Sequence, residues 1–351
     1  MNIREATPKD NHELQRLQAK CPQGTKLIVS LINTPDFFAR AKAYGSYKVY
    51  LAYEDNHIIG SAGCGMRKTI INDDIRQVGY EFQYFTSPDY RGKGVAKQLH
   101  KQIEDHLTQQ GVVLSYLLVI EGNFPAMHLF ESLGFKRHRI LVMPGLALYK
   151  EVDIPPQGRI RSISPNDLAV VAELLNGTWQ GYNLYEPTSA ETLIKFINRT
   201  PAFNFDNLLG LEDQDEIQAC LGFWDWSQIM KITMKSLSLK MKMMGFLLDI
   251  ARLFWPMPRM PKVGETLKQW CLTPIGFKDP RYLAVLLRYL NNLALQRGIQ
   301  QIFCIGERGH TLLNSLKGFI HVDTAMHLYV KPLQQNVLMS DAPIFIDGID
   351  L

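Results

Sequence analysis

The stretch Tyr84–Ala96, YFTSPDYRGKGVA, decides the fold. It begins with residues that favour a β-strand, reaches Pro88, and continues through a glycine-rich turn, Arg91–Gly94. An amphipathic helix is predicted to follow at once, because apolar residues recur at every fourth position and place one face inward. These residues are Val95, Leu99, Ile103 and Leu107.

A strand, a glycine-rich turn and a helix, in that order, favour the binding of a pyrophosphate. Glycines let the backbone approach the anion closely. The unpaired N–H groups of the first helical turn and the helix dipole both favour its negative charge. Arg91 and Lys93 add cations beside the turn. An ordinary loop is the alternative, and a nicotinamide-type Gly-x-Gly-x-x-Gly turn is disfavoured because Lys97 occupies its sixth place.

Two segments at the expected distance resemble a known family. Arg91–Ala96 is similar to the acetyl-CoA motif of the GNAT acyltransferase superfamily, Gln/Arg-x-x-Gly-x-Gly/Ala. Asn123–Phe135, NFPAMHLFESLGF, resembles the family's next element, Asn-x-x-Ala-x-x-Leu-Tyr-x-x-x-Gly-Phe. The resemblance implies an α/β (α+β) fold, in which a mixed, mostly antiparallel sheet is flanked by helices.

The same resemblance implies acetyl-CoA as co-substrate, with no metal. Pantetheine would lie along the main chain of the central strand, at Tyr84, Phe85 and Thr86. The turn and the first helical residues would hold the pyrophosphate: Arg91, Gly92, Lys93, Gly94, Val95, Ala96 and Lys97. Asn123 would reach the cofactor from the other edge.

Acetyl transfer to an amine needs an uncharged nucleophile, and a free lysine has a pKa of about 10.4, so a base or a water chain must remove a proton. Glu81 is the candidate, because many relatives carry a glutamate at this place on the strand; a solvated carboxylate is the alternative. Glu121 is a weaker second candidate. Strand alternation predicts two opposite sets of side chains, Glu81, Gln83 and Phe85 against Tyr80, Phe82 and Tyr84.

Phe130 departs from the family pattern, in which a tyrosine often acts as the general acid. Phenylalanine cannot protonate the leaving thiolate. Either another hydroxyl does so, with Tyr116 or Tyr84 as candidates, or the thiolate leaves unaided. His128 is expected to be a packing or surface residue. The sequence therefore leaves two hypotheses: an N-acetyltransferase acting on a primary amine, or a non-catalytic acetyl-CoA-binding regulatory or scaffold protein.

The length of 351 residues predicts two domains. We expect a GNAT acetyl-CoA-binding domain over 1–150, a linker over 151–158 that is rich in proline, and a diverged GNAT-like domain over 159–351. The second half repeats a helix start, since Ser164–Asp167 resembles Thr7–Asp10, but Asp279–Tyr282 stands where its acetyl-CoA turn should be. This tandem arrangement resembles the Hookless-type probable N-acetyltransferases, as do two short segments, Cys21–Leu31 and Ser115–Asn123.

The composition is that of a globular protein, with 46% hydrophobic and 21% charged residues. A net charge of +4 is too small to indicate nucleic-acid binding. The five cysteines lack disulfide or metal spacing, which favours a reducing compartment. The first residues lack an apolar signal region, and no apolar run is long enough to span a membrane. A cytoplasmic protein with a small or protein-borne amine acceptor is expected; its oligomeric state is open.

Three further segments carry expectations. We expect helix-like and loop-like pieces over 21–46, which would hold acceptor contacts, and a polar loop over 70–75. Residues 231–262 are rich in Met, Leu, Phe and Lys. The favoured interpretation is a helix packed on its domain with lysines in water, because the lysines at 231, 235, 240 and 242 share no clean face. The alternative is a basic amphipathic segment that touches a membrane or a partner.

Overall fold

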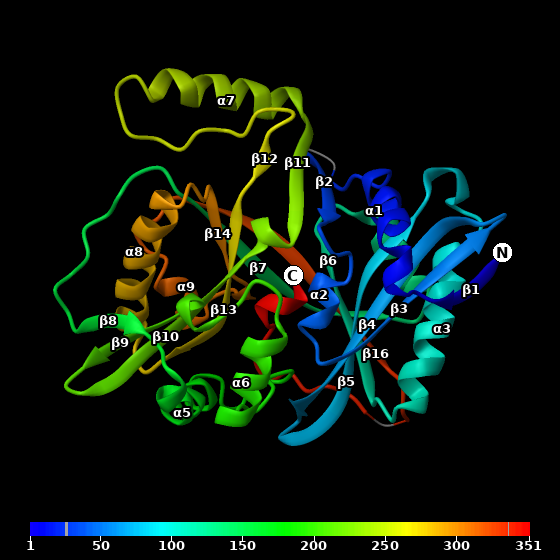
Figure 1. The fold of residues 1–351 in the computed structure, drawn as a ribbon, viewed down its shortest axis with the longest axis horizontal. Coiled ribbons are helices and arrows are strands. Elements are labelled where there is room, and N and C mark those ends of the chain that lie inside the picture. Colours follow the sequence, from blue (N-terminus) through cyan, green and yellow to red (C-terminus); the bar gives the residue numbers. More distant parts are fainter. Residues whose placement is uncertain (25–26, 336) are drawn as a thin grey trace.

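A single large sheet runs through the whole chain (Figure 1). The computed structural model describes residues 1–24, 27–335 and 337–351. The sheet strands of the N-terminal half are β1 (Asn2–Glu5), β3 (Ser46–Glu54), β4 (His57–Ile71), β5 (Asp74–Thr86), β6 (Leu114–Ile120) and β7 (Lys136–Ala147). Those of the C-terminal half are β8 (Arg159–Ser162), β9 (Leu208–Asp213), β10 (Glu216–Asp225), β13 (Gln269–Phe277), β14 (Gln301–Phe303), β15 (Gly306–Glu307) and β16 (His321–Pro332).

The strand order shows that the two halves exchange their last strands. It runs β1-β3-β4-β5-β6-β16-β7-β14-β13-β10-β9-β8 in a 13-stranded sheet, with β15 paired to β7. β16 therefore lies between β6 and β7, while β7 joins β14 of the other half. The pairs β5–β6 and β13–β14 are parallel and the other described pairs are antiparallel. The predicted mixed, mostly antiparallel sheet is confirmed.

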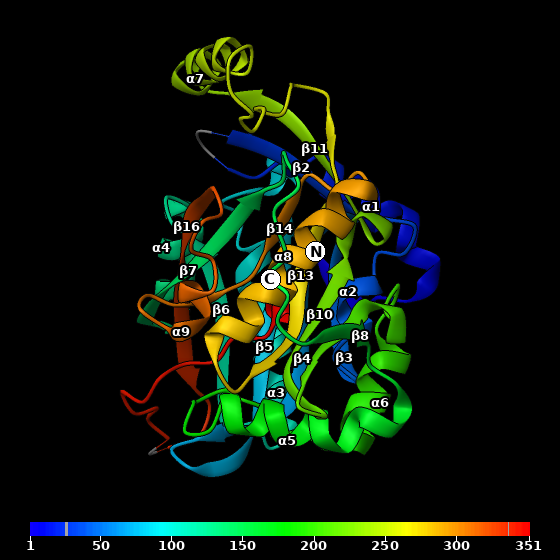
Figure 2. The ribbon, with the colours of Figure 1, turned by 90° about the vertical axis from the view of Figure 1, so that its left-hand side faces the viewer.

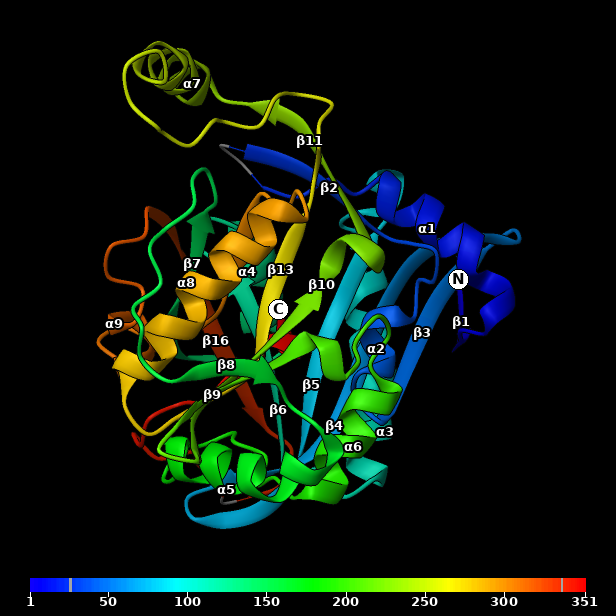
Figure 3. The same ribbon diagram turned by 60° about the vertical axis from the view of Figure 1, so that its left-hand side comes forward.

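Helices cover both faces of the sheet. They are α1 (Asn11–Ala19), α2 (Ala39–Lys42), α3 (Val95–Gln109), α4 (Phe124–Ser132), α5 (Leu168–Thr178), α6 (Ala190–Arg199), α7 (Leu239–Ala251), α8 (Pro280–Gln296) and α9 (Thr311–Asn314). α3 packs on β3, β4 and β5 through its predicted apolar face, and α8 packs on β9, β10 and β13 (Figure 3). α3 follows β5 and α8 follows β13, and each of these strands is the first member of a parallel pair.

Both halves begin with the same capped turn. A short 3-10 helix precedes α1 (Pro8–Asp10) and another precedes α5 (Pro165–Asp167). Each carries a capping box, in which Thr7 pairs with Asp10 and Ser164 pairs with Asp167. Arg4 donates to Asp10 at 2.7 and 2.8 Å, and Arg161 donates to Asp167 at 2.8 and 2.9 Å. The predicted helix starts are confirmed.

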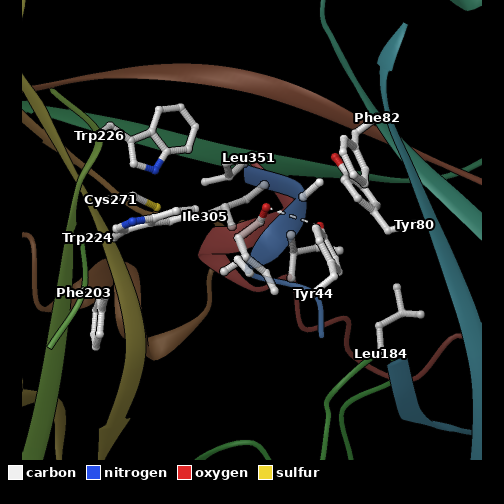
Figure 4. Packing of buried hydrophobic residues seen from close by; sticks show 14 of the residues in the cluster. Tyr44, Tyr80, Phe82, Leu184, Phe203, Trp224, Trp226, Cys271, Ile305 and Leu351 are labelled. Carbon is white, nitrogen blue, oxygen red and sulfur yellow. Dashed lines mark hydrogen bonds between the residues drawn. The ribbon is translucent and has the colours of Figure 1, made fainter. Parts of the chain in front are cut away.

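The largest hydrophobic cluster contains side chains from both halves. Figure 4 shows Tyr44, Tyr80 and Phe82 on one side and Trp224, Trp226 and Ile305 on the other. Between them lies the end of the chain, where the short helix Gly348–Asp350 is fully buried. The apolar interior is therefore continuous across the middle of the sheet.

Two segments that were expected to lack strands contain them. Residues 21–46 contain β2 (Leu27–Asn33), which pairs with β11 (Met230–Leu237), and β11 also pairs with β12 (Thr266–Leu267). The partner of β2 comes from far along the chain, so local patterns missed it; residues 25 and 26 lie outside the described residues. The predicted loop 70–75 is also wrong, because Asn72 and Asp73 adopt left-handed conformations that close a two-residue hairpin.

The segment 231–262 also differs from the favoured expectation. It starts as strand β11 and continues as α7, which stands away from the rest of the molecule (Figure 2). The expected packing of this helix on its domain is wrong, because its apolar residues are mostly exposed. No helix within the described ranges is long and apolar enough to cross a bilayer.

Candidate active site

The central feature of the site is a gap between β5 and β6. These parallel strands pair only from Val78–Leu114 to Tyr80–Tyr116. Beyond that point each strand is paired only on its other edge, β5 with β4 and β6 with β16. The main chain of the predicted residues Tyr84, Phe85 and Thr86 therefore lies on a strand edge that faces the gap.

The gap leads to the predicted anion-binding turn. Gly92 and Gly94 adopt φ values of 76° and 79°, and an added Cβ at either would have no atom within 4 Å. Both positions need the left-handed conformation that glycine tolerates. The first amide to bond back into the turn is that of Gln98, which donates to Gly94 O at 3.1 Å.

The neighbouring groups leave this turn open to an anion. The amides of Val95, Ala96 and Lys97 have no backbone partner among the described hydrogen bonds. The Arg91 and Lys93 side chains are exposed beside them. Val95 is buried and anchors the helix, since its side chain fills the space beside Gly60. The turn thus presents free amides and two cations to solvent.

Asn123 lies at the start of α4, beyond the end of β6. Its Oδ1 accepts a hydrogen bond from the Ala126 amide at 3.4 Å, so the side chain caps α4. The helix is held against the sheet by Met127 and Phe130, which are buried. The cap explains the local structure, and contact with a cofactor remains a prediction.

Glu81 is buried within a set of hydrogen bonds. One carboxylate oxygen accepts from Ser115 Oγ at 2.6 Å. The other accepts from the Tyr84 hydroxyl and lies 3.0 Å from His100 Nδ1. A buried carboxylate requires such partners, because burial of an unpaired charge is very unfavourable. The residue predicted to act as the base, Glu81, is therefore shielded from bulk water.

A bulge in β5 overturns the predicted alternation of side chains. Gln83 has a φ of 55°, and the register with β4 shifts between Ser61 and Gly63. The inserted residue turns Tyr84 to the face that holds Glu81 and sends Gln83 to the other face, where its Nε2 donates to Asn33 Oδ1 at 3.0 Å. The expected grouping of Gln83 with Glu81 is wrong.

The hydrogen bonds of Glu81 continue to the surface. His100 Nε2 lies 3.1 Å from Lys331 Nζ, which donates to Glu104 Oε2 at 2.8 Å. The Glu104 side chain is 34% exposed, so this chain of groups connects the buried site with solvent. Lys331 belongs to β16 of the C-terminal half. Sequence reasoning missed His100, Ser115 and Lys331. Only His100 could have been found from the sequence, because it lies between Leu99 and Ile103 on the face of the helix that was predicted to be buried.

Tyr84 carries a hydroxyl beside Phe130, the position where relatives carry the acid. Its ring packs edge-to-face on the Phe130 ring, with centroids 5.1 Å apart. Burial and the Glu81 carboxylate raise the pKa of the Tyr84 hydroxyl well above its ordinary value, so it stays protonated. The second candidate base, Glu121, is exposed, and so is His128, which was expected to be a packing or surface residue.

The second candidate hydroxyl, Tyr116, lies in a different cluster. Its hydroxyl donates to Asp350 at 3.0 Å and accepts from Arg67 at 2.5 Å. Tyr44 donates to the same carboxylate at 2.5 Å. Burial raises the pKa of Asp350, while the Arg67 guanidinium opposes this shift. This cluster joins the last helical turn to β4 and β6.

No group of three or more potential metal-ligating side chains occurs in the described part of the chain.

Comparison with known proteins finds a family match for the N-terminal part of the chain. Residues 11–135, about a third of the sequence, match the acetyltransferase (GNAT) family. The matched segment includes the β5–β6 gap, the Arg91–Gly94 turn and α4. The match and the fold support acyl transfer in general.

Solved structures extend the likeness beyond residues 11–135. Yeast (Saccharomyces cerevisiae) N-myristoyltransferase with bound myristoyl-CoA shares 11% identity and a TM-score of 0.64, over 94% of this chain and 78% of that one. A probable N-acyltransferase from Enterococcus faecalis shares 12% identity and a TM-score of 0.52, over 95% and 72%. The glucosamine N-acetyltransferase region of a fungal multi-domain β-N-acetylglucosaminidase shares 14% identity and a TM-score of 0.60, over 94% and 38%. No curated protein matches the sequence. At these identities the likeness shows a common fold.

Proposed function

We propose that the chain is an N-acetyltransferase that moves an acetyl group from acetyl-CoA directly to a primary amine. One observation carries the proposal: the unpaired edge of β5 leads from the gap into a turn of free amides and cations. Pantetheine would lie along Tyr84–Thr86, the pyrophosphate would bind at Arg91–Lys97, and Asn123 would approach from the α4 side.

In the reaction the amine nitrogen attacks the thioester carbonyl carbon, a C–N bond forms, and the C–S bond then breaks. An ammonium acceptor must first lose a proton. Glu81 would accept this proton and pass it through His100 to solvent near Glu104, while Lys331 holds both of these groups as a donor. As the C–S bond breaks, Tyr84, protonated and next to Phe130, would give its proton to the leaving thiolate. Glu81 would then take the second proton from the nitrogen and return it to Tyr84. An amine and acetyl-CoA thus become an amide and coenzyme A.

A non-catalytic acetyl-CoA-binding regulatory or scaffold protein is the second candidate. Phe130 cannot act as an acid, and the Glu81 oxygens are already occupied by Ser115, Tyr84 and His100. Such a protein would bind the cofactor through the same turn without turnover. Its partners would respond to acetyl-CoA binding.

We also propose that residues 159–351 form a diverged GNAT-like domain, joined to residues 1–150 by the linker 151–158, in the Hookless-type tandem arrangement. The repeated capping boxes and the mirrored strand order support this duplication. A cytoplasmic location is part of the proposal, and the five cysteines, all free and buried, fit a reducing compartment.

The test measures release of coenzyme A with a panel of donors and acceptors. Donors are acetyl-CoA, octanoyl-CoA and myristoyl-CoA, since one structural neighbour binds myristoyl-CoA. Acceptors are polyamines, amino acids, aminoglycosides and lysine peptides. Gly94→Glu, which places a carboxylate in the anion-binding turn, is the control.

Acceptor-dependent release from acetyl-CoA that is lost in Gly94→Glu would support the proposal and name the acceptor class. Release from long-chain donors alone would replace acetyl with a longer acyl group. Binding of acetyl-CoA without release would favour the regulatory protein. If acetyl-CoA does not bind at all, both candidates fail.

A further inference from the structure

The segment 239–263 forms an arm that projects from the molecule (Figures 1–3). β11 leads out to α7, and the chain returns beneath it to β12. Gly245 is the one buried residue of α7, and a Cβ there would lie 3.2 Å from Met260 Cβ. The returning chain therefore covers one side of α7 and leaves the other side uncovered.

The uncovered side of α7 is apolar. Of the 20 exposed large hydrophobic residues among the described ones, nine lie between residues 239 and 255. Five of them recur with the spacing of one helical face: Leu239, Met243, Phe246, Ile250 and Leu253. Leu239 and Leu253, at the two ends of this row, are 75% and 78% exposed. Such a continuous exposed surface marks an interaction site.

Two lysines border this apolar face. With about 100° of rotation per residue, the five residues of this row span an arc of roughly 80°. Lys242 lies about 20° beyond one edge of the arc and Lys240 about 60° beyond the other, and both are exposed. Long lysine side chains at such edges can extend their ammonium groups away from an apolar layer. Lys240 and Lys242, which share no single face of α7, therefore lie on opposite sides of its apolar row.

The arm also concentrates positive charge. Residues 239–263 contain five basic residues and one acidic residue, Asp249, which lies 3.5 Å from Arg252. Removing these from the chain's 38 basic and 34 acidic residues leaves 33 of each sign. The net charge of +4 therefore falls within residues 239–263, where Arg259 also pairs with Glu265 just beyond them.

We propose that this arm docks on an anionic lipid membrane surface, with α7 lying in the plane of the interface. The apolar face would enter the boundary between headgroups and acyl chains, and the flanking lysines would contact anionic headgroups. Phe254 and Trp255, exposed at the end of the helix, are residue types that favour this boundary. A second copy of the chain would present the same positive charge and be repelled.

The experiment uses the full chain and phosphatidylcholine vesicles with or without phosphatidylserine. Trp255 is exposed while the other four tryptophans are buried, so its emission reports on the arm. We expect co-sedimentation with the phosphatidylserine vesicles and a blue shift of emission that Trp255→Phe removes. Phe246→Glu combined with Leu253→Glu, and Lys240→Glu combined with Lys242→Glu, should each weaken binding at least about tenfold.

The matched control is Val170→Glu, which places the same charge at an exposed apolar position of α5 and should bind as the unchanged chain does. Circular dichroism and thermal melting check that each variant is folded. The proposal is overturned if the chain ignores phosphatidylserine vesicles, or if the arm variants still bind. Self-association through the arm without lipid binding, or binding of an acidic protein in its place, overturns it as well. Gly94→Glu should bind vesicles normally, which separates this test from the acyltransferase test.

Discussion

At the residue scale, Glu81 is the group whose surroundings bear most on the proposed chemistry. Its hydrogen bonds to Ser115 and Tyr84 and its contact with His100 hold a carboxylate beside the β5–β6 gap. Glu81→Gln keeps the size of the side chain and removes its basicity. We expect turnover to fall about a hundredfold or more, with unchanged affinity for acetyl-CoA.

Steady-state kinetics and calorimetric binding of acetyl-CoA check this expectation. Glu104→Gln is the matched control at the exposed end of the same chain of groups, and we expect a smaller loss there because solvent can accept a proton directly. Equal turnover in Glu81→Gln and the unchanged chain would rule out the proposed base.

Tyr84 supports a second prediction at this scale. Removal of its hydroxyl in Tyr84→Phe should lower kcat by about ten- to a hundredfold, because the leaving thiolate would lose its proton donor. Phe130→Tyr introduces a hydroxyl on the ring that packs against Tyr84, and should restore part of the activity of Tyr84→Phe. If Tyr84→Phe retains full kcat over the whole pH range, the thiolate leaves unaided.

At the scale of elements, the two capping boxes make a pH-dependent contribution to stability. The hydrogen bond from Arg4 lowers the pKa of Asp10 to about 2, and that from Arg161 lowers the pKa of Asp167 further. A carboxyl whose pKa is lower in the folded state stabilises the fold above its unfolded pKa, near 3.9. This contribution is lost as the pH falls through the folded pKa.

Asp10→Asn and Asp167→Asn should each lower the free energy of unfolding by about 1 kcal/mol at neutral pH. The difference from the unchanged chain should shrink below about pH 4, where the unfolded carboxyl takes up a proton. Urea unfolding between neutral pH and pH 3 checks this, with Asp105→Asn on the exposed side of α3 as control. A difference that grows in acid would contradict the assigned role of these carboxylates.

At the scale of the whole molecule, the exchanged strands join the two halves into one sheet. β16 supplies both the neighbour of β6 and the Lys331 ammonium beside His100. A fragment ending at residue 150 would lack this strand and expose the edges of β6 and β7. We expect this fragment to show no cooperative thermal transition, whereas the full chain unfolds in one step.

A protease site introduced into the exposed segment 154–158 provides the complementary test. After cleavage the two halves should remain together in gel filtration and melt as one unit, because the strand exchange does not depend on the linker. Separation of the halves into folded monomers would show that each is stable alone.

The sequence by itself determined the features that arise from neighbours along the chain. The Arg91–Gly94 turn, the apolar face of α3 and the two capped helix starts all depend on residues a few positions apart. Backbone conformation and side-chain spacing within one turn suffice for such features, so their patterns are visible in the letters alone.

Only the tertiary structure decided which distant segments meet. Lys331 and His100 are 231 residues apart, and β2 and β11 are separated by most of the chain, so no local pattern indicates either pair. The bulge at Gln83 arises where β5 meets β4, and it turned Tyr84 toward Glu81. The exposure of α7 likewise depends on what the remainder of the sheet leaves uncovered, because burial is a property of the packed molecule.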